Sequence, residues 1–266
     1  MKLVVVGGQA RKVGKTSVIA GLIRGLNTLA WTAVKISHHA GAADAQDMPS
    51  AYDLPAHLDF ALGEERDPSG NGDTSRYLAA GARRALWMRA RGGGLAQALP
   101  GLLEALEGDE HVIIESNSIL AFLQPAVFLL VMGESRRDLK ASARQFLGRV
   151  DALVTVRPDL EPRACPATSL PMPEGKPVFP VWVGEWSNPG LCHFVGERLL
   201  RTAEHSQAWN PLTRPAPAEE NAGAAHPLPQ GGEGWIDVEG DRSSTNVKTP
   251  EHRPREAGSA LPPTRE

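Results

Sequence analysis

The sequence has few cysteines, few aromatic residues and no long apolar run, and these absences exclude several classes of protein. Its two cysteines, Cys165 and Cys192, cannot supply the disulfide framework of a small secreted domain. No apolar run approaches the ~20 residues of a membrane helix, and no charged-then-apolar leader of secretory length begins the chain. The net charge of −3 gives no sign of a nucleic-acid partner. We therefore expect a cytoplasmic protein that has neither a membrane nor a nucleic-acid partner.

The composition of the chain changes near residue 205. Before this point, apolar runs typical of strands alternate with segments of helical periodicity. After it, the sequence is polar and rich in Pro, Gly and Glu, and its apolar residues are isolated. Such a segment buries too little apolar surface to offset its chain entropy. We predict one folded domain over residues 1–205 and a disordered, low-complexity tail over 206–266, which is either a binding segment or a read-through product.

Strands that alternate with helices predict an α/β fold, with a mostly parallel sheet covered by helices on both faces. Residues 38–72 show little periodicity and are expected to form a long surface loop. Helices are expected over residues 15–30, 74–81, 95–106, 135–148 and 188–203. Seven strands are expected, at Leu3–Val6, Trp31–Ile36, Ala85–Arg89, Val112–Glu115, Val127–Met132, Ala152–Val156 and Val178–Val183.

The segment GGQARKVGKTS, residues 7–17, connects the first strand to the first helix and is typical of a phosphate-binding loop. The usual spacing, Gly-x4-Gly-Lys-Ser/Thr, would place a glycine where Gln9 stands, so this loop is one residue longer. Lys15 is expected to reach the β- and γ-phosphates, and the Thr16 hydroxyl to ligate Mg²⁺. The residues predicted to bind the nucleotide are Gly8, Lys12, Val13, Gly14, Lys15, Thr16 and Ser17.

The longer loop resembles that of the dethiobiotin synthetase branch of P-loop proteins. GQARKVGKT matches the Gly-x5-Gly-Lys-Thr pattern of that branch, and Val13 also matches. Lys12 and its neighbour Arg11 either add positive charge over the phosphates or are solvated loop cations. The resemblance implies a P-loop NTPase fold over residues 1–205.

Two further stretches narrow the resemblance. VKISHHAG, residues 34–41, and DTSRYLAAGARRALWM, residues 73–88, resemble motifs of the MobB family (molybdopterin-guanine dinucleotide biosynthesis protein B) in the same order after the phosphate loop. The matching positions are Lys35, His38, His39, Asp73, Ala80, Gly81 and Ala82, and the likeness covers roughly residues 1–160. It implies GTP binding with slow hydrolysis, a role beside the enzyme that attaches GMP to molybdopterin, a protein partner and a homodimer.

The chain also departs from the MobB pattern. Ile36 replaces a histidine, Ser37 replaces a threonine, and IIESNS stands where the family has Val-Glu-Gly. In that last segment, Glu115 ends a strand at the edge where a parallel sheet presents its ligands. We interpret Glu115 as a catalytic residue, together with Lys15, and as a Mg²⁺ ligand, together with Thr16.

Three acidic or basic candidates remain open from the sequence. Asp73 is either a helix cap or a second carboxylate near Mg²⁺, and it is also a candidate contact for a substrate or a partner. His38 and His39 are expected to contact phosphate, a substrate or a partner. With Asp44 and Asp47 they also resemble a metal set, but adjacent residues on an extended segment point in opposite directions.

The bound base and the reaction also remain open. Arg157 and Asp159 follow a late strand, where guanine readers carry their specificity residues, so GTP and ATP are both candidates. One alternative to the MobB-like role is an ATP-dependent small-molecule ligase or kinase of the dethiobiotin synthetase type. The other is an adaptor in which nucleotide binding acts only as a switch.

Overall fold

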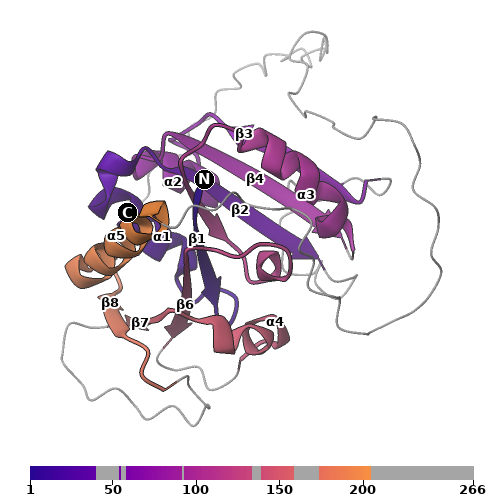
Figure 1. Ribbon diagram of the computed structural model, residues 1–266. Helices are drawn as coiled ribbons and strands as arrows, with labels where there is room; N and C mark the ends of the chain where they lie inside the picture. The colour runs from indigo at the N-terminus through magenta and orange to yellow at the C-terminus, as the bar shows by residue number, and fades with distance from the viewer. Residues whose placement is uncertain (40–53, 55–57, 92, 134–138, 159–173, 205–266) are drawn as a thin grey trace, which may run out of the picture.

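The computed structural model describes residues 1–39, 54, 58–91, 93–133, 139–158 and 174–204, which fold around one eight-stranded sheet (Figure 1). The spatial order of its strands is β3-β4-β2-β5-β1-β6-β7-β8. Only β3 and β4 pair antiparallel, and every other neighbouring pair is parallel. The predicted α/β fold is therefore confirmed. The strands are β1 (Lys2–Gly8), β2 (Thr32–His39), β3 (Phe60–Glu65), β4 (Arg84–Arg91), β5 (His111–Glu115), β6 (Val127–Gly133), β7 (Ala152–Arg157) and β8 (Val178–Trp182).

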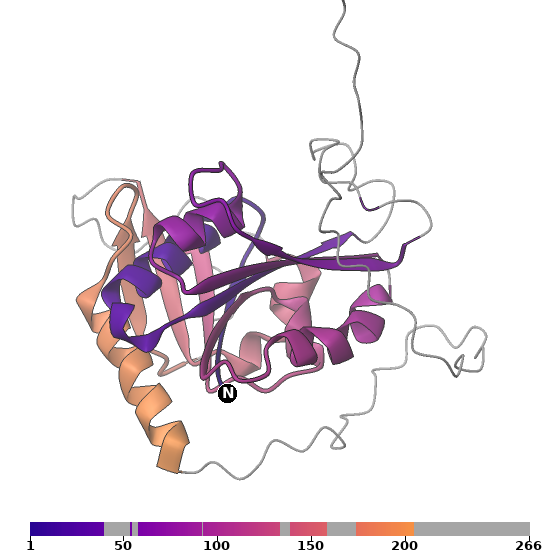
Figure 2. The ribbon, with the colours of Figure 1, turned by 90° about the horizontal axis from the view of Figure 1, so that it is seen from above.

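Helices cover both faces of this sheet (Figure 2). Helices α1, α2 and α5 contribute to the core on one face, and α3 and α4 to the core on the other. The run Leu3–Val6 of β1 is wholly apolar because both faces of this strand are buried. Val4 and Val6 lie in the core beside α1, α2 and α5 (the first core), whereas Leu3 and Val5 lie in the core beside α3 and α4 (the second core). The helices are α1 (Lys15–Gly25), α2 (Asp73–Ala79), α3 (Gly94–Ala105), α4 (Ala141–Gln145) and α5 (Pro189–Glu204), with 3-10 turns at Asn27–Leu29, Ser118–Ala121 and Leu147–Arg149.

The prediction of a loop over residues 38–72 is wrong at two places: His38 and His39 end β2, and Phe60–Glu65 form β3 at the edge of the sheet. The segment FALGEE contains a glycine and ends in two charged residues, a composition that disfavours a strand on propensity alone. Pairing with β4 overrides that preference, and Gly63 lies opposite Trp87 in the register. Residues 40–53 and 55–57 of the predicted loop lie outside the described residues.

Two helices are shorter than their periodicity indicated. Helix α1 ends at Gly25 rather than near Ala30, and a 3-10 turn follows. A Cβ at Gly25 would lie 2.4 Å from the Cys192 Sγ of α5, so the two helices approach closely at this point. Of the helix predicted over 135–148, the described part contains α4 (Ala141–Gln145) and a 3-10 turn, and residues 134–138 lie outside the described residues.

The last helix begins where the sequence indicated. The Asn188 Oδ1 accepts a hydrogen bond of 2.9 Å from the Leu191 N–H, and Pro189 is the first residue of α5. This arrangement satisfies one of the N–H groups that a helix leaves without a partner at its start. Among the described helices, none is both long enough and apolar enough to span a bilayer. The tail over 206–266 lies outside the described residues.

Candidate functional site

The loop between β1 and α1 accommodates its additional residue by turning Gln9 inward. Gln9 is completely buried, although the usual spacing has a glycine there. Its N–H donates to the carbonyl of Val131 at 2.9 Å, and its Oε1 accepts from the N–H of Gly133 at 3.2 Å. Its own carbonyl accepts from the N–H of Lys140 at 3.0 Å. The longer loop is therefore hydrogen-bonded to the end of β6 through both the backbone and the side chain of Gln9.

Two glycines of the loop are required by its geometry. Gly14 has φ of 92°, a left-handed conformation that glycine adopts without steric cost. At Gly8, a Cβ would lie 2.6 Å from the Lys15 Cδ, so the lysine side chain passes directly over this glycine. Gly8 is also held by Asn117, whose Oδ1 accepts from the Gly8 N–H at 2.8 Å and whose Nδ2 donates to the Gly8 carbonyl at 3.1 Å.

The carboxylate of Glu115, at the end of β5, joins the loop to the neighbouring elements. Its Oε2 accepts hydrogen bonds from the Thr16 hydroxyl at 2.9 Å and from the Tyr77 hydroxyl at 2.5 Å. Its Oε1 lies 2.5 Å from the Lys35 Nζ and 3.5 Å from the Lys15 Nζ. Because the Glu115 side chain is only 2 % exposed, these contacts replace water almost completely.

These contacts keep Glu115 ionised. Burial by itself would raise the pKa of Glu115, but the ammonium groups of Lys35 and Lys15 and the hydrogen bonds from Lys35 and Tyr77 lower it to about 2. The opposite applies to Tyr77, since burial and the adjacent negative charge of Glu115 raise the pKa of its hydroxyl well above the ordinary value. Tyr77 is therefore a hydrogen-bond donor, and Glu115 an acceptor, over the whole physiological range.

The two lysines that face Glu115 differ in their protonation. Burial opposes the charge on Lys35, yet the carboxylates of Glu115 and Asp73 raise its pKa above the ordinary value. The pKa of Lys15 is lowered, because burial and the repulsion of Lys35 together outweigh the attraction of Glu115, 3.5 Å away, and of Asp73. An anion bound in the loop would complete the charge balance around Lys15.

Asp73 is placed beside this cluster but does not cap its helix. It is the first residue of α2, and Gly72 occupies the N-cap position with no side-chain cap hydrogen bond. The prediction of a cap at Asp73 is therefore wrong. Its Oδ2 instead lies 2.8 Å from the Lys35 Nζ, because β2 runs directly beside the start of α2. Asp73 is thus the second carboxylate that faces the Lys35 ammonium group.

The donor set around Glu115 fits Mg²⁺ better than a softer metal. The Thr16 hydroxyl and the Glu115 carboxylate are both oxygen donors, which Mg²⁺ prefers, and bound phosphates and water supply the remaining ligands in such sites. Within the described residues, no group of three or more His, Cys, Asp or Glu side chains is arranged to hold a metal by itself. Asp44 and Asp47, which the sequence suggested beside the histidines, lie outside the described residues.

The remaining predicted site residues are distributed around this centre. Val13 is buried and anchors the loop in the first core, whereas Lys12 is exposed and has a left-handed φ of 56°. The Ser17 hydroxyl accepts a hydrogen bond of 2.7 Å from Arg76 of α2. His38 and His39 are the last two residues of β2, in register with Ala90 and Arg91 of β4.

Three residues of the site were missed from the sequence. Tyr77 follows Asp73 by four residues and shares its helix face, a spacing that was readable in principle. Lys140 lies near the loop: burial and the repulsion of Lys15 lower its pKa to about 8. Trp186, in the β8–α5 connection, packs beside Gly14, where a Cβ would lie 2.9 Å from the indole ring. No local signal marks Lys140 or Trp186, because tertiary packing alone brings them to the loop.

Comparison with known proteins adds the following. No protein-family model matches the chain, and no curated protein matches it. Among solved structures, it is similar to LpxK from Aquifex aeolicus in complex with ATP (18% identity, TM-score 0.42, 68% of this chain and 53% of that one). It is also similar to HypB from Helicobacter pylori in complex with nickel (13% identity, TM-score 0.42, 78% and 90%). The chain thus spans about half the length of LpxK. Likenesses of this extent are too distant to assign an activity.

Proposed function

We propose that this chain is a Mg²⁺-dependent GTP-binding P-loop protein with slow GTPase activity. Its role would be that of a MobB-like accessory factor in the biosynthesis of molybdopterin guanine dinucleotide. One observation carries the proposal: three separated sequence motifs meet at Glu115. Thr16 and Lys15 reach it from the phosphate loop, and Lys35 reaches it from the MobB-like motif after β1–α1. Tyr77 reaches it from the second MobB-like motif, and Asp73 of that motif pairs with Lys35.

The contacts of Glu115 favour slow turnover. Lys15 and the N–H groups at the start of α1 would hold the phosphates, while Thr16 and Glu115 would hold Mg²⁺, which would offset charge on the phosphates. A carboxylate with a pKa of about 2 is a weak proton acceptor at neutral pH. Glu115 is therefore suited to positioning a cation and not to activating water, as expected of a protein whose nucleotide regulates a partner.

We also infer from this arrangement which way a bound nucleotide would extend. The residues that would engage Mg²⁺ and the terminal phosphate lie toward β5 and β2. The base would then extend toward the opposite half of the sheet, where Trp186 borders Gly14 and Arg157 ends β7. Asp159, the other base-reading candidate, lies outside the described residues.

The proposal predicts Mg²⁺-dependent binding of GTP at least about tenfold tighter than that of ATP, measured by isothermal titration calorimetry on the full chain. Lys15→Ala is expected to weaken GTP binding at least about thirtyfold, because it removes a charged partner from a partly buried site. Arg24→Ala, which removes an exposed cation from the last turn of α1 at the other end of that helix, is the control and is expected to change the affinity by less than about threefold.

The other outcomes of this titration are informative. Equal or tighter binding of ATP would contradict the MobB-like proposal and favour a small-molecule kinase or ligase. Lack of binding of either nucleotide by folded protein would contradict nucleotide function altogether. GTP binding with no detectable release of phosphate over hours would favour the non-catalytic switch.

A second prediction concerns pH and Lys140. The pKa of Lys140 is about 8 in the free protein, and a bound polyphosphate would raise it because it favours the charged ammonium. Affinity for GTP is therefore expected to fall as pH rises from 7 to 9, by about tenfold. Lys140→Met should give a weaker affinity at pH 7 and a flatter profile, measured by the same titration. Unchanged pH dependence in Lys140→Met would show that Lys140 does not sense the phosphates.

One observation favours a kinase or ligase as the second candidate. Lys35 and Asp73 line a cavity, and Lys35 also contacts Glu115, beside which the terminal phosphate is proposed to lie. A group-transfer enzyme needs such a space for its second substrate.

A further inference from the structure

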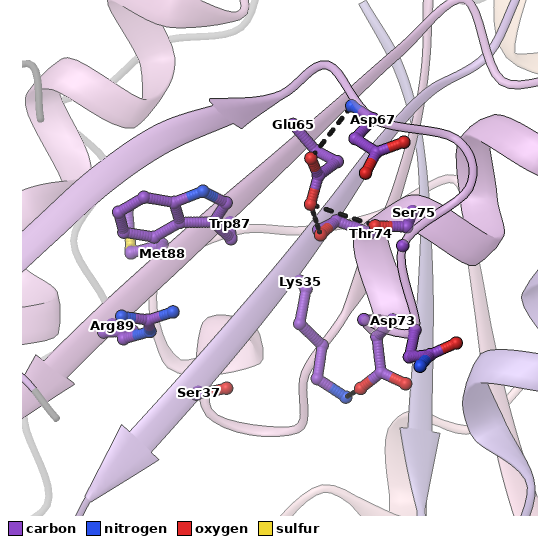
Figure 3. A pocket seen from close by; sticks show the side chains of 13 residues that line it. Lys35, Ser37, Glu65, Asp67, Asp73, Thr74, Ser75, Trp87, Met88 and Arg89 are labelled. Carbon is purple, nitrogen blue, oxygen red and sulfur yellow. Dashed lines mark hydrogen bonds and ion pairs between the residues drawn. The ribbon is translucent and has the colours of Figure 1, made fainter. Parts of the chain in front are cut away.

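The cavity beside Lys35 has a volume of about 450 Å³, within the range of small-molecule sites. Strands β2 and β4 form one side of it, and the turn that leads from β3 into α2 forms the other (Figure 3). Of the residues that line it, Asp73 alone was among the site residues predicted from the sequence. Its walls differ in chemistry, and that difference indicates the kind of ligand that fits.

The wall on β4 is flat, aromatic and positively charged. Trp87 lies opposite Gly63 of β3, where a Cβ would come within 2.3 Å of the indole, so the missing side chain gives the ring its room. Arg89 follows two residues later on the same face of β4, and its guanidinium carbon lies 4.6 Å from the centroid of the Trp87 ring. Indole and guanidinium planes both stack on flat unsaturated rings, and the guanidinium attracts anions.

The opposite wall is fixed in place by Glu65. One oxygen of its carboxylate accepts hydrogen bonds from the Thr74 hydroxyl at 3.2 Å and the Ser75 hydroxyl at 3.1 Å. The other accepts from the backbone N–H groups of Arg66 and Asp67, both at 3.0 Å. Figure 3 shows the bonds to Asp67, Thr74 and Ser75 across the turn. Both walls are therefore formed before any ligand binds, which lowers the entropic cost of binding.

The floor of the cavity is shared with the phosphate site. The Lys35 Nζ lies between Asp73 at 2.8 Å and Glu115 at 2.5 Å, and both Lys35 and Asp73 line the cavity. A ligand that places an anionic group near Lys35 would therefore be within one side chain of a nucleotide in the loop.

We propose that this cavity binds a second small molecule, a flat heteroaromatic compound with an anionic group. Its ring stacks against the Trp87–Arg89 wall, and its anion lies near Arg89 and Lys35. The ring edge meets the polar side chains of the opposite wall. The site does not include the phosphate loop, although it shares Lys35 and Asp73 with the proposed nucleotide site. Its role as a sensor of a second ligand rests on the proposed GTP-binding function.

The test uses flavin mononucleotide as the probe, because its fluorescence is quenched when its ring stacks on tryptophan. Saturable quenching by the full chain is expected at a Kd below about 1 mM. Riboflavin, which has the ring without phosphate, and ribose 5-phosphate, which has phosphate without the ring, should each bind at least about tenfold more weakly. Equal binding of riboflavin would overturn the anionic requirement, and equal binding of ribose 5-phosphate, measured by competition, would overturn the aromatic one.

Variants place the probe in the cavity. Trp87→Leu and Arg89→Gln should each weaken probe binding at least about tenfold, whereas Trp182→Phe, on the distant strand β8, should not. Arg89 is half-exposed, so Arg89→Gln is expected to fold and tests the site even if Trp87→Leu impairs folding. Quenching that is absent, or that survives both cavity variants, overturns the proposal. Lys15→Ala should lose GTP binding but keep flavin mononucleotide binding. Loss of nucleotide binding at the loop is therefore distinguishable from loss of ligand binding at this cavity.

Discussion

Replacing Glu115 with alanine is expected to lower the free energy of unfolding by about 3–5 kcal/mol, the usual cost of removing one partner from a buried ion pair. The substitution leaves the ammonium groups of Lys35 and Lys15 without their shared carboxylate and the Tyr77 hydroxyl without its acceptor. Lys35 retains only Asp73, whose side chain is 37 % exposed and whose interaction is therefore screened by water. Urea unfolding followed by circular dichroism measures the effect.

The matched control is Glu110→Ala. Glu110 directly precedes β5, the strand that ends at Glu115, and its exposed carboxylate pairs with Lys2. This substitution is expected to leave the unfolding midpoint unchanged. If the two variants are destabilised equally, the cluster around Glu115 contributes nothing beyond a surface ion pair, and the electrostatic account of the site is wrong.

The same cluster predicts that the free energy of unfolding of the parent protein falls at acid pH. Glu115 has a folded-state pKa of about 2, lower than its ordinary 4.5, so the folded protein binds its proton less readily than the unfolded chain. Its contribution, roughly 3 kcal/mol, is fully present above pH 4.5 and is lost as pH falls toward 2. Glu115→Ala should therefore lose less stability than the parent over that window.

Gly21→Ala is expected to destabilise the protein by about 1–3 kcal/mol, although helix propensity alone predicts a gain of about 1 kcal/mol for this change inside α1. A Cβ at Gly21 would lie 2.0 Å from the carbonyl oxygen of Trp186, which is backbone and cannot rotate away. Helix α1 and the β8–α5 connection must then separate. Because that connection places the indole of Trp186 beside Gly14, GTP binding is expected to weaken as well.

Gly148→Ala provides the comparison for this substitution, because no atom lies within 4 Å of a Cβ built there and its φ is not positive. It should leave both stability and GTP affinity unchanged. A stabilised Gly21→Ala protein would mean that α1 has room to move away from residue 186 at little cost, and that the contact does not set the geometry of the loop.

Local patterns were sufficient for the framework of the site. The run Leu3–Val6, the glycines at 8 and 14 and the periodicity after Lys15 together specify a strand, a loop and a helix, because each depends on residues close in sequence. Glu115 was readable for the same reason, since it ends a buried strand and the ends of parallel strands lie along one edge of the sheet. The strand β3 was not readable, because its stability comes from β4 and not from its own residues.

The sequence by itself therefore determined the α/β architecture and the position of the candidate phosphate loop, because periodicity, glycine geometry and strand ends are local properties. The tertiary structure decided what surrounds that loop. It brings Tyr77 and Lys35 onto Glu115, turns Asp73 from a cap into a partner of Lys35, and places Trp186 beside Gly14. Each of these depends on contacts between residues 38 or more positions apart, whose cost in chain entropy is met by the packing of the whole sheet and is not visible in any short segment.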